Sequence, residues 1–136
     1  MAYSQRRAAL KHGWKSGLEE RVADSLSARG FRFDYEREPL VYVEPERKRR
    51  YTPDFFITTR SGNEIIVETK GRWTREDRMK MKLVVQQHPE RDIRFVFQNP
   101  NAKINKGSKT TYAMWCDREL GCQWAKGDVP LGWLVE

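Results

Sequence analysis

The chain has 136 residues, which favours one domain, and its 26 Lys and Arg against 19 Asp and Glu give a net charge of +7. A surface this basic favours a polyanionic partner, and nucleic acid is the commonest one. The two cysteines fit no zinc, redox or disulfide pattern, and no apolar run could span a membrane or act as a signal peptide, so we expect a cytoplasmic protein with reduced thiols.

The N-terminal part of the chain predicts a basic arm followed by a helix. Residues 1–15 are rich in cations and lack periodicity. Beyond them, apolar residues recur at every fourth position, which predicts a helix over 17–29. Ser16 precedes Glu19 by three residues, the spacing of a capping box, in which Glu19 has a structural role that is sufficient by itself.

Two extended segments and a charged connector follow the helix. FRFDYE at 31–36 alternates aromatic and polar residues, which predicts a strand with one buried face. LVYV at 40–43 is a second candidate strand. The segment at 44–50, EPERKRR, ends in four consecutive cations, and we expect it to be a connector or bridge.

The segment YTPDFFITTRSGNEIIVETKG at 51–71 predicts a hairpin of two apolar strands that ends in charged residues. If the chain turns around Ser61, residue 54 lies opposite 68 and residue 56 opposite 66. Side chains on a strand alternate between faces, so Glu68 and Lys70 point the same way, whereas Thr69 points the other way with its carbonyl able to face the site.

In this register Asp54 and Glu68 are like charges side by side, which is unfavourable without a cation between them. Lys70 could be that cation. A divalent ion is the better candidate, because two carboxylates, a carbonyl and waters suit Mg²⁺. A surface hairpin with a salt bridge is the alternative. The pattern P-D followed by apolar residues and E-x-K resembles the PD-(D/E)xK nuclease superfamily, and together with the basic surface it favours a nuclease.

The remainder alternates helices and strands. Thr74 begins a predicted helix that ends at Pro89, IRFVF at 93–97 predicts a buried strand, and residues 111–120 predict a third helix. Apolar residues near the C-terminus, Trp133 and Leu134, are expected to dock on the body. The order of elements predicts a mixed α/β fold with a central sheet flanked by helices.

Several segments together resemble the phage endonuclease I family of Holliday-junction resolvases. They are SGLEERV, YTPDFFI, VETKGRW, EDRMKMKLVVQQHPERDIRFVF and KGSKTTYAMWC, and they run in order through nearly the whole chain. The resemblance implies a restriction-endonuclease-like fold. It also implies a Mg²⁺-dependent, structure-selective endonuclease that resolves four-way and other branched DNA junctions by paired cuts.

The resemblance implies a set of site residues as well. The catalytic residues would be Glu19, Asp54, Glu68 and Lys70. The ligands of two Mg²⁺ ions, which Mn²⁺ would replace, would come from Asp54, Glu68, Glu19 and the carbonyl of Thr69. Phage origin implies action in the cytoplasm of a bacterial host.

The family also implies an intertwined homodimer. Within a single nuclease domain, 1–136, the helix and strands at 16–43 would be exchanged between chains, the segment at 44–50 would be the basic bridge, and 51–136 would form the catalytic remainder. Each site would then take Glu19 from the partner chain. The cation run in the bridge departs from the family pattern.

Twelve cations are candidates for contacts with DNA phosphates, although any single one could be a solvated surface residue. They are Arg6, Arg7, Lys11, Arg47, Lys48, Arg49, Arg50, Arg72, Arg75, Lys103, Lys106 and Lys109. Two other functions stay open at this point. One is a related PD-(D/E)xK nuclease that cuts duplex DNA in restriction, repair or transposition, and the other is a basic DNA-binding domain without catalysis.

Overall fold

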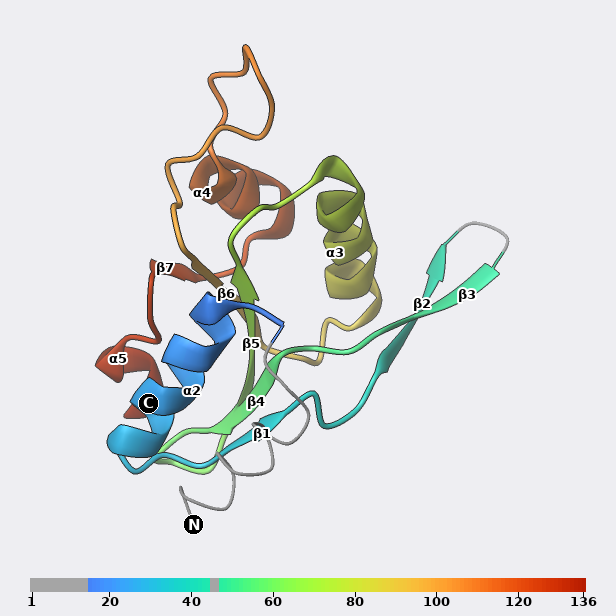
Figure 1. The fold of residues 1–136 in the computed structure, drawn as a ribbon. Helices are drawn as coiled ribbons and strands as arrows, with labels where there is room; N and C mark the ends of the chain where they lie inside the picture. Colours follow the sequence, from blue (N-terminus) through green and yellow to red (C-terminus); the bar gives the residue numbers. More distant parts are fainter. Residues whose placement is uncertain (1–14, 45–46) are drawn as a thin grey trace.

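The structure is a computed structural model that describes residues 15–44 and 47–136 (Figure 1). Nearly all of the predicted basic arm lies outside the described residues, and so do its three candidate DNA-binding cations, Arg6, Arg7 and Lys11. None of the helices in the described part of the chain is long and apolar enough to cross a membrane.

A five-stranded sheet in the spatial order β1-β4-β5-β6-β7 forms the centre of the fold. The pairs β1–β4 and β4–β5 are antiparallel, whereas β5–β6 and β6–β7 are parallel. The predicted mixed α/β class is therefore confirmed. In the order just given, the strands span Phe33–Tyr35, Phe55–Thr58, Glu64–Lys70, Ile93–Phe97 and Trp124–Lys126.

The hairpin of β4 and β5 has the predicted register. Phe56 lies opposite Ile66, so the chain does turn around Ser61. Gly62 adopts a φ of +91° in the turn, a conformation that costs glycine little and other residues more. The charged end of the hairpin is the end away from this turn.

The two long helices begin and end close to their predicted positions. α2 spans Gly17–Ala28, and the hydroxyl of Ser16 accepts a hydrogen bond of 3.1 Å from the backbone N–H of Glu19. α3 spans Arg75–Gln87, and Thr74 caps it in the same way. Side-chain capping satisfies a backbone donor that would otherwise lack a partner in the first turn.

Apolar side chains pack on both faces of the sheet. α2 and the short α5 (Leu131–Leu134) cover one face, where Leu26 and Val67 are buried. α3 covers the other face, where Trp73 and Ile66 are buried (Figure 1). Because strand residues alternate, Glu68 and Lys70 project from the same face as Ile66.

A second, two-stranded sheet forms an arm that projects from the body (Figure 1). It consists of β2 (Leu40–Glu44) and β3 (Arg47–Tyr51), paired antiparallel. Most of the predicted bridge at 44–50 is therefore regular strand.

The C-terminal end of α3 holds this arm. The side-chain amide of Gln87 accepts a hydrogen bond of 2.6 Å from the N–H of Val43 and donates one of 2.7 Å to its carbonyl. The ring nitrogen Nε2 of His88 lies 2.6 Å from the carbonyl oxygen of Val41. Side chains of α3 thus occupy the outer edge of β2.

Three elements differ from their predictions. β1 is shorter than the predicted 31–36, because Glu36 takes a φ of +47° and leaves the extended conformation. β7 was not predicted, since its three residues offer too little alternation. The predicted helix at 111–120 consists of α4 (Tyr112–Trp115) continued by a π-helical turn over Cys116–Leu120.

The last residues dock on the body as predicted. Leu134 is fully buried, and its carbonyl accepts a hydrogen bond of 2.8 Å from the N–H of Arg60 in the β4–β5 turn. Arg94, which is 3% exposed, forms ion pairs of 2.8 Å with Asp92 and 2.7 Å with Glu136.

Candidate active site

A polar cleft of about 320 Å³ lies where β5 ends, between the start of α2 and the root of the arm. The five residues expected from the sequence to form the site all line it, although they come from three separate segments. They are Glu19, Asp54, Glu68, Thr69 and Lys70.

Asp54 is held by the strand opposite it. Its Oδ2 accepts hydrogen bonds of 2.9 Å from both the backbone N–H and the hydroxyl of Thr69. Its own N–H donates to Oε1 of Glu68 at 3.1 Å. The prediction that the Thr69 side chain turns away from the acids is wrong, because Asp54 lies just before β4 and its carboxylate reaches across to that hydroxyl.

Burial makes the carboxylate of Asp54 costly to ionise. Burial raises the pKa of Asp54 well above its ordinary value, and the charge of Glu68 raises this pKa further. The two hydrogen bonds from Thr69 favour the ionised form and offset part of the shift. Asp54 and Glu68 are only 8% and 4% exposed, so water screens their repulsion poorly.

Lys70 faces these acids from the end of β5. Its Nζ lies 3.4 Å from Oε2 of Glu68 and 4.0 Å from Oδ2 of Asp77. Burial by itself lowers the pKa of Lys70, but Glu68, Asp77 and Asp54 outweigh burial and raise this pKa above its ordinary value. The side chain is therefore an ammonium at neutral pH.

Glu19 both caps α2 and reaches the cleft. It is 5% exposed, and its Oε2 accepts a hydrogen bond from the phenol of Tyr35. Burial raises the pKa of Glu19, and Asp54 adds to the rise, while Tyr35 and Ser16 oppose it through hydrogen bonds. The capping role and a position in the site are thus compatible.

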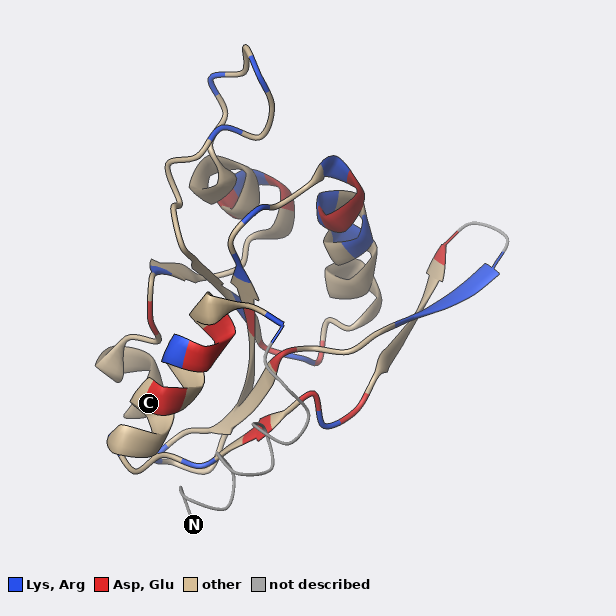
Figure 2. Ribbon diagram, in the orientation of Figure 1, with Lys and Arg blue, Asp and Glu red and all other residues tan. Residues whose placement is uncertain are grey.

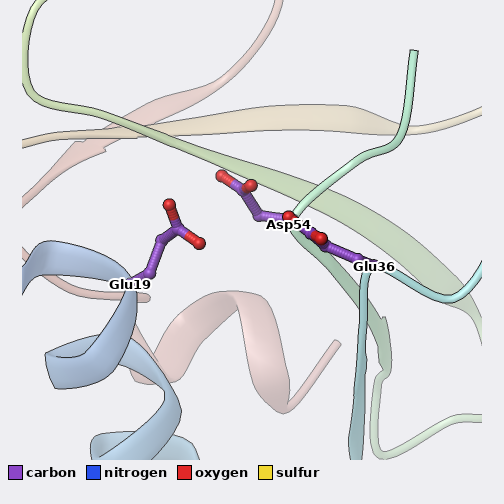
Figure 3. Close-up of side chains that lie close together, drawn as sticks. All are labelled: Glu19, Glu36 and Asp54. Atoms are coloured by element: carbon purple, nitrogen blue, oxygen red, sulfur yellow. The ribbon is translucent and has the colours of Figure 1, made fainter. Parts of the chain in front are cut away.

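Glu36 is a site residue that sequence reasoning missed. One carboxylate oxygen from each of Glu19, Glu36 and Asp54 lies within 4.8 Å of the others, and Figure 3 shows these side chains drawn together from α2, the end of β1 and the start of β4. The backbone N–H of Glu36 donates to the carbonyl of Asp54 at 2.9 Å, and Lys15 pairs with its carboxylate at 2.8 Å. Such a cluster could hold a metal ion.

Asp54 therefore stands between two groups of acids, with Glu68 on one side and Glu19 with Glu36 on the other. Three further cations line the cleft beside Lys70, and the sequence pattern did not single out any of them for the site itself. They are Lys15, Arg50 and Lys80. Acids at the centre with cations around them suit a phosphate diester whose hydrolysis needs a bound cation.

The cations proposed from the sequence to contact DNA are spread over the surface. All nine that the structure describes are exposed, on β3, on the segment between β5 and α3, at the start of α3, and on the loop before α4 (Figure 2). Arg50 is the member of this set that also lines the active-site cleft. The others lie outside that cleft.

A mixed sheet that presents a PD hairpin, an E-x-K strand end and clustered acids in a cation-lined cleft defines the class of the protein as a nuclease. Comparisons with known proteins agree. The chain belongs to the phage endonuclease I family, whose model matches residues 1–136. It is therefore an enzyme, an endodeoxyribonuclease of that family.

Two relatives show how far the similarity extends. The chain is 41% identical to "Endodeoxyribonuclease 1" of Enterobacteria phage T3 over 130 residues, which cover 96% of this chain and 82% of the relative. It is 42% identical to "Endonuclease I" of Escherichia phage T7 over 123 residues, which cover 90% of this chain and 79% of the relative. The resemblance stated from sequence segments alone is thereby confirmed.

Proposed function

We propose that the protein is a divalent-metal-dependent, structure-selective endonuclease that resolves four-way DNA junctions and other branched DNA by paired phosphodiester hydrolysis. The observation that carries the proposal is the cleft that gathers Glu19, Asp54, Glu68 and Lys70 in a member of the phage endonuclease I family. The net charge of +7 supports a DNA substrate.

The residues at the cleft fit Mg²⁺, with Mn²⁺ as a substitute. Clustered carboxylates within 4.8 Å of one another, two of them with raised pKa, are stabilised by a cation between them. Asp54, Glu68 and the carbonyl of Thr69 would hold one ion, and Glu19, Glu36 and Asp54 a second. When bound, such ions act as Lewis acids on the phosphoryl oxygens.

The chain's own residues would then orient the substrate. Lys70, as an ammonium, would donate hydrogen bonds to the attacking water or to the charge that develops on the phosphate. Lys15, Arg50 and Lys80 would attract the phosphodiester into the cleft. Thr69 would favour the ionised form of Asp54 and hold its carboxylate in place through two hydrogen bonds.

The first test compares an immobile four-way junction with linear duplex of the same sequence, end-labelled and incubated with Mg²⁺ or with EDTA. We expect paired nicks near the branch point, with Mg²⁺ only. Asp54→Asn, Glu68→Gln and Lys70→Ala should each slow cleavage by at least roughly 100-fold while junction binding persists. Asp34→Asn, which changes an exposed carboxylate on β1, is the matched control and should cut normally.

Three results would contradict this proposal. Equal cleavage of duplex and junction would favour a related nuclease of restriction, repair or transposition type. Metal-independent cutting, or full activity in all three site variants, would show that the assigned residues do not carry the reaction.

We propose further that two chains form an intertwined dimer in which each site takes Glu19 from the partner. The support is topological: α2 and β1 connect to the catalytic remainder only through the arm, so opening the β2–β3 hairpin would exchange them between chains. A two-fold dimer would present two equivalent sites to a junction with near two-fold symmetry.

Mixed dimers test this arrangement. Refolding Glu19→Gln chains together with Asp54→Asn chains should restore about half of the sites in the heterodimer, because one composite site is then intact. Mixing Asp54→Asn with Glu68→Gln chains is the control, since both residues belong to the same half and no intact site can form. Restoration in neither mixture, with heterodimers shown to be present, would refute the shared site.

A further inference from the structure

A second cleft, separate from the active site, lies between the segment that joins β5 to α3 and the loop before α4. Its volume is about 520 Å³. Arg72 and Arg75 line one wall, and Lys103 and Lys106 line the other. We call it the basic cleft, and we call its outer wall, residues 103–111, the finger (Figure 1).

The charge of the basic cleft is not balanced by acids. Its ten lining residues include four cations and no carboxylate, and within the described part of the chain none of the four cations forms an ion pair. The neighbouring cleft between the arm and α3 differs, because Glu44, Glu76 and Asp77 line it together with its cations. Figure 2 shows Lys and Arg positions on the segment between β5 and α3 and on the loop before α4.

The finger is a built element. Lys103 pairs with Thr111 as in an antiparallel strand, and the N–H of Ile104 donates to the carbonyl of Thr110 at 2.9 Å. Gly107 turns the tip with a φ of +85°, which other residues would adopt only with strain. The two lysines of the finger that line the basic cleft, Lys103 and Lys106, therefore stand on a hydrogen-bonded backbone.

A buried arginine ties the two walls together. Arg78 of α3 is 3% exposed, and its Nη1 donates to the carbonyls of Trp73 at 2.7 Å and of Ile104 at 3.3 Å. Its guanidinium also lies over the ring of Trp115, 5.7 Å from the centroid. The Arg78 side chain thus links the wall that carries Arg72 to the wall that carries Lys103.

The backbone of the inner wall adds to the preference for an anion. Thr74 and Arg75 lie at the N-terminus of α3, whose dipole favours negative charge. The acids of its first turn face elsewhere, since Asp77 approaches Lys70 and Glu76 lines the neighbouring cleft. The wall toward the finger therefore keeps its positive character.

We infer that the basic cleft binds a backbone phosphate of the DNA arm that continues from the cleaved strand. This inference rests on the proposed function for its ligand. Arg72 follows Lys70 by two residues, a reach of roughly 7 Å, so the phosphate bound here lies within a few base-pair steps of the scissile one. The cleft would hold the arm in register without reading its sequence.

The test measures binding of an immobile four-way junction in EDTA at several salt concentrations. Arg72→Gln/Lys106→Gln should weaken binding about 10-fold or more. It should also lower the slope of log affinity against log salt by about 1 for each lost contact. The charge-preserving pair Arg72→Lys/Lys106→Arg should keep the wild-type slope. Arg32→Gln/Arg60→Gln, exposed cations outside both clefts, is the control for net charge and should also keep it.

The outcomes separate this inference from the proposed function. An unchanged salt slope in the Gln pair would overturn the inference that the basic cleft binds DNA. An equal loss of slope in the control pair would overturn it as well. If the Gln pair lowers the slope as expected but the wild-type protein leaves the junction uncut in Mg²⁺, the proposed function alone would be overturned. A chain that binds no DNA would overturn both.

Discussion

Asp54→Asn should make the protein more stable while it abolishes cleavage. Burial and the charge of Glu68 make ionised Asp54 unfavourable. One oxygen of Asp54 also lies within 4.8 Å of oxygens of Glu19 and Glu36, and two unit charges at that distance repel by about 3.5 kcal/mol at an effective dielectric constant of 20. Lys15 offsets part of this repulsion, and Asn weakens the hydrogen bonds from Thr69. We therefore expect a net gain of about 1–2 kcal/mol in the free energy of unfolding at neutral pH, or about 3–10 °C in Tm.

The pH dependence follows from the direction of the pKa shift. The pKa of Asp54 is raised in the folded protein, so ionisation costs stability as pH rises from the unfolded value through the folded value. In acid the carboxyl is protonated in both states and this cost is absent. The advantage of Asp54→Asn over wild type should accordingly be present at pH 7.5 and shrink toward pH 4.

Thermal unfolding followed by circular dichroism, in EDTA and in Mg²⁺, measures both effects. Mg²⁺ should raise the Tm of the wild type, since an ion that binds only the folded state stabilises it, and should leave Asp54→Asn nearly unchanged. Asp34→Asn, at a carboxylate 53% exposed, should shift Tm little under either condition. A lower Tm for Asp54→Asn in EDTA at pH 7.5, or an advantage of equal size at pH 4, would refute the reasoning.

Three further outcomes are expected. Thr69→Val should raise the Mg²⁺ concentration for half-maximal cleavage about 10-fold or more, whereas Thr69→Ser, which keeps the hydroxyl, should not. The same Mg²⁺ requirement in both variants would rule out a role for the hydroxyl. Glu36→Gln should lower cleavage at limiting Mg²⁺ by about 10-fold, with partial recovery at high Mg²⁺, and unchanged rates would place this residue outside the metal cluster. Arg94→Met should lower the free energy of unfolding, measured by urea titration, by about 1–3 kcal/mol without changing cleavage per folded molecule. Arg37→Met is the control: it removes an exposed ion-pair network and should cost less than about 1 kcal/mol. Similar losses for the two arginine variants would show that burial of Arg94 adds nothing.

Local chemistry explains why much of the fold could be predicted. The capping residues Ser16 and Thr74 mark the starts of α2 and α3 because each satisfies a backbone donor within its own turn. The register of the β4–β5 hairpin follows from the turn at Gly62, and this register alone brings Asp54 next to Glu68. These features depend on neighbours close in sequence.

The missed features depend on contacts between distant segments. Glu36 reaches the acids because β1 pairs with β4 and because its backbone adopts a positive φ, and neither fact has a signal in FRFDYE. β7 exists because β6 offers a parallel edge to three residues that would not be a strand alone. Lys80 enters the active-site cleft through the packing of α3, which no pattern of charges reveals.

The arm has a consequence for how the protein avoids aggregation by strand addition. A two-stranded ribbon exposes two rows of backbone donors and acceptors, which can template the addition of strands from other molecules. Here Gln87 and His88 occupy polar groups along the β2 edge, and the β3 edge carries the consecutive cations of 47–50. Neighbouring molecules in solution therefore meet a blocked edge or a repelling one. A polyanion would remove the repulsion, so aggregation along this ribbon should be resisted most strongly when the enzyme is free of nucleic acid.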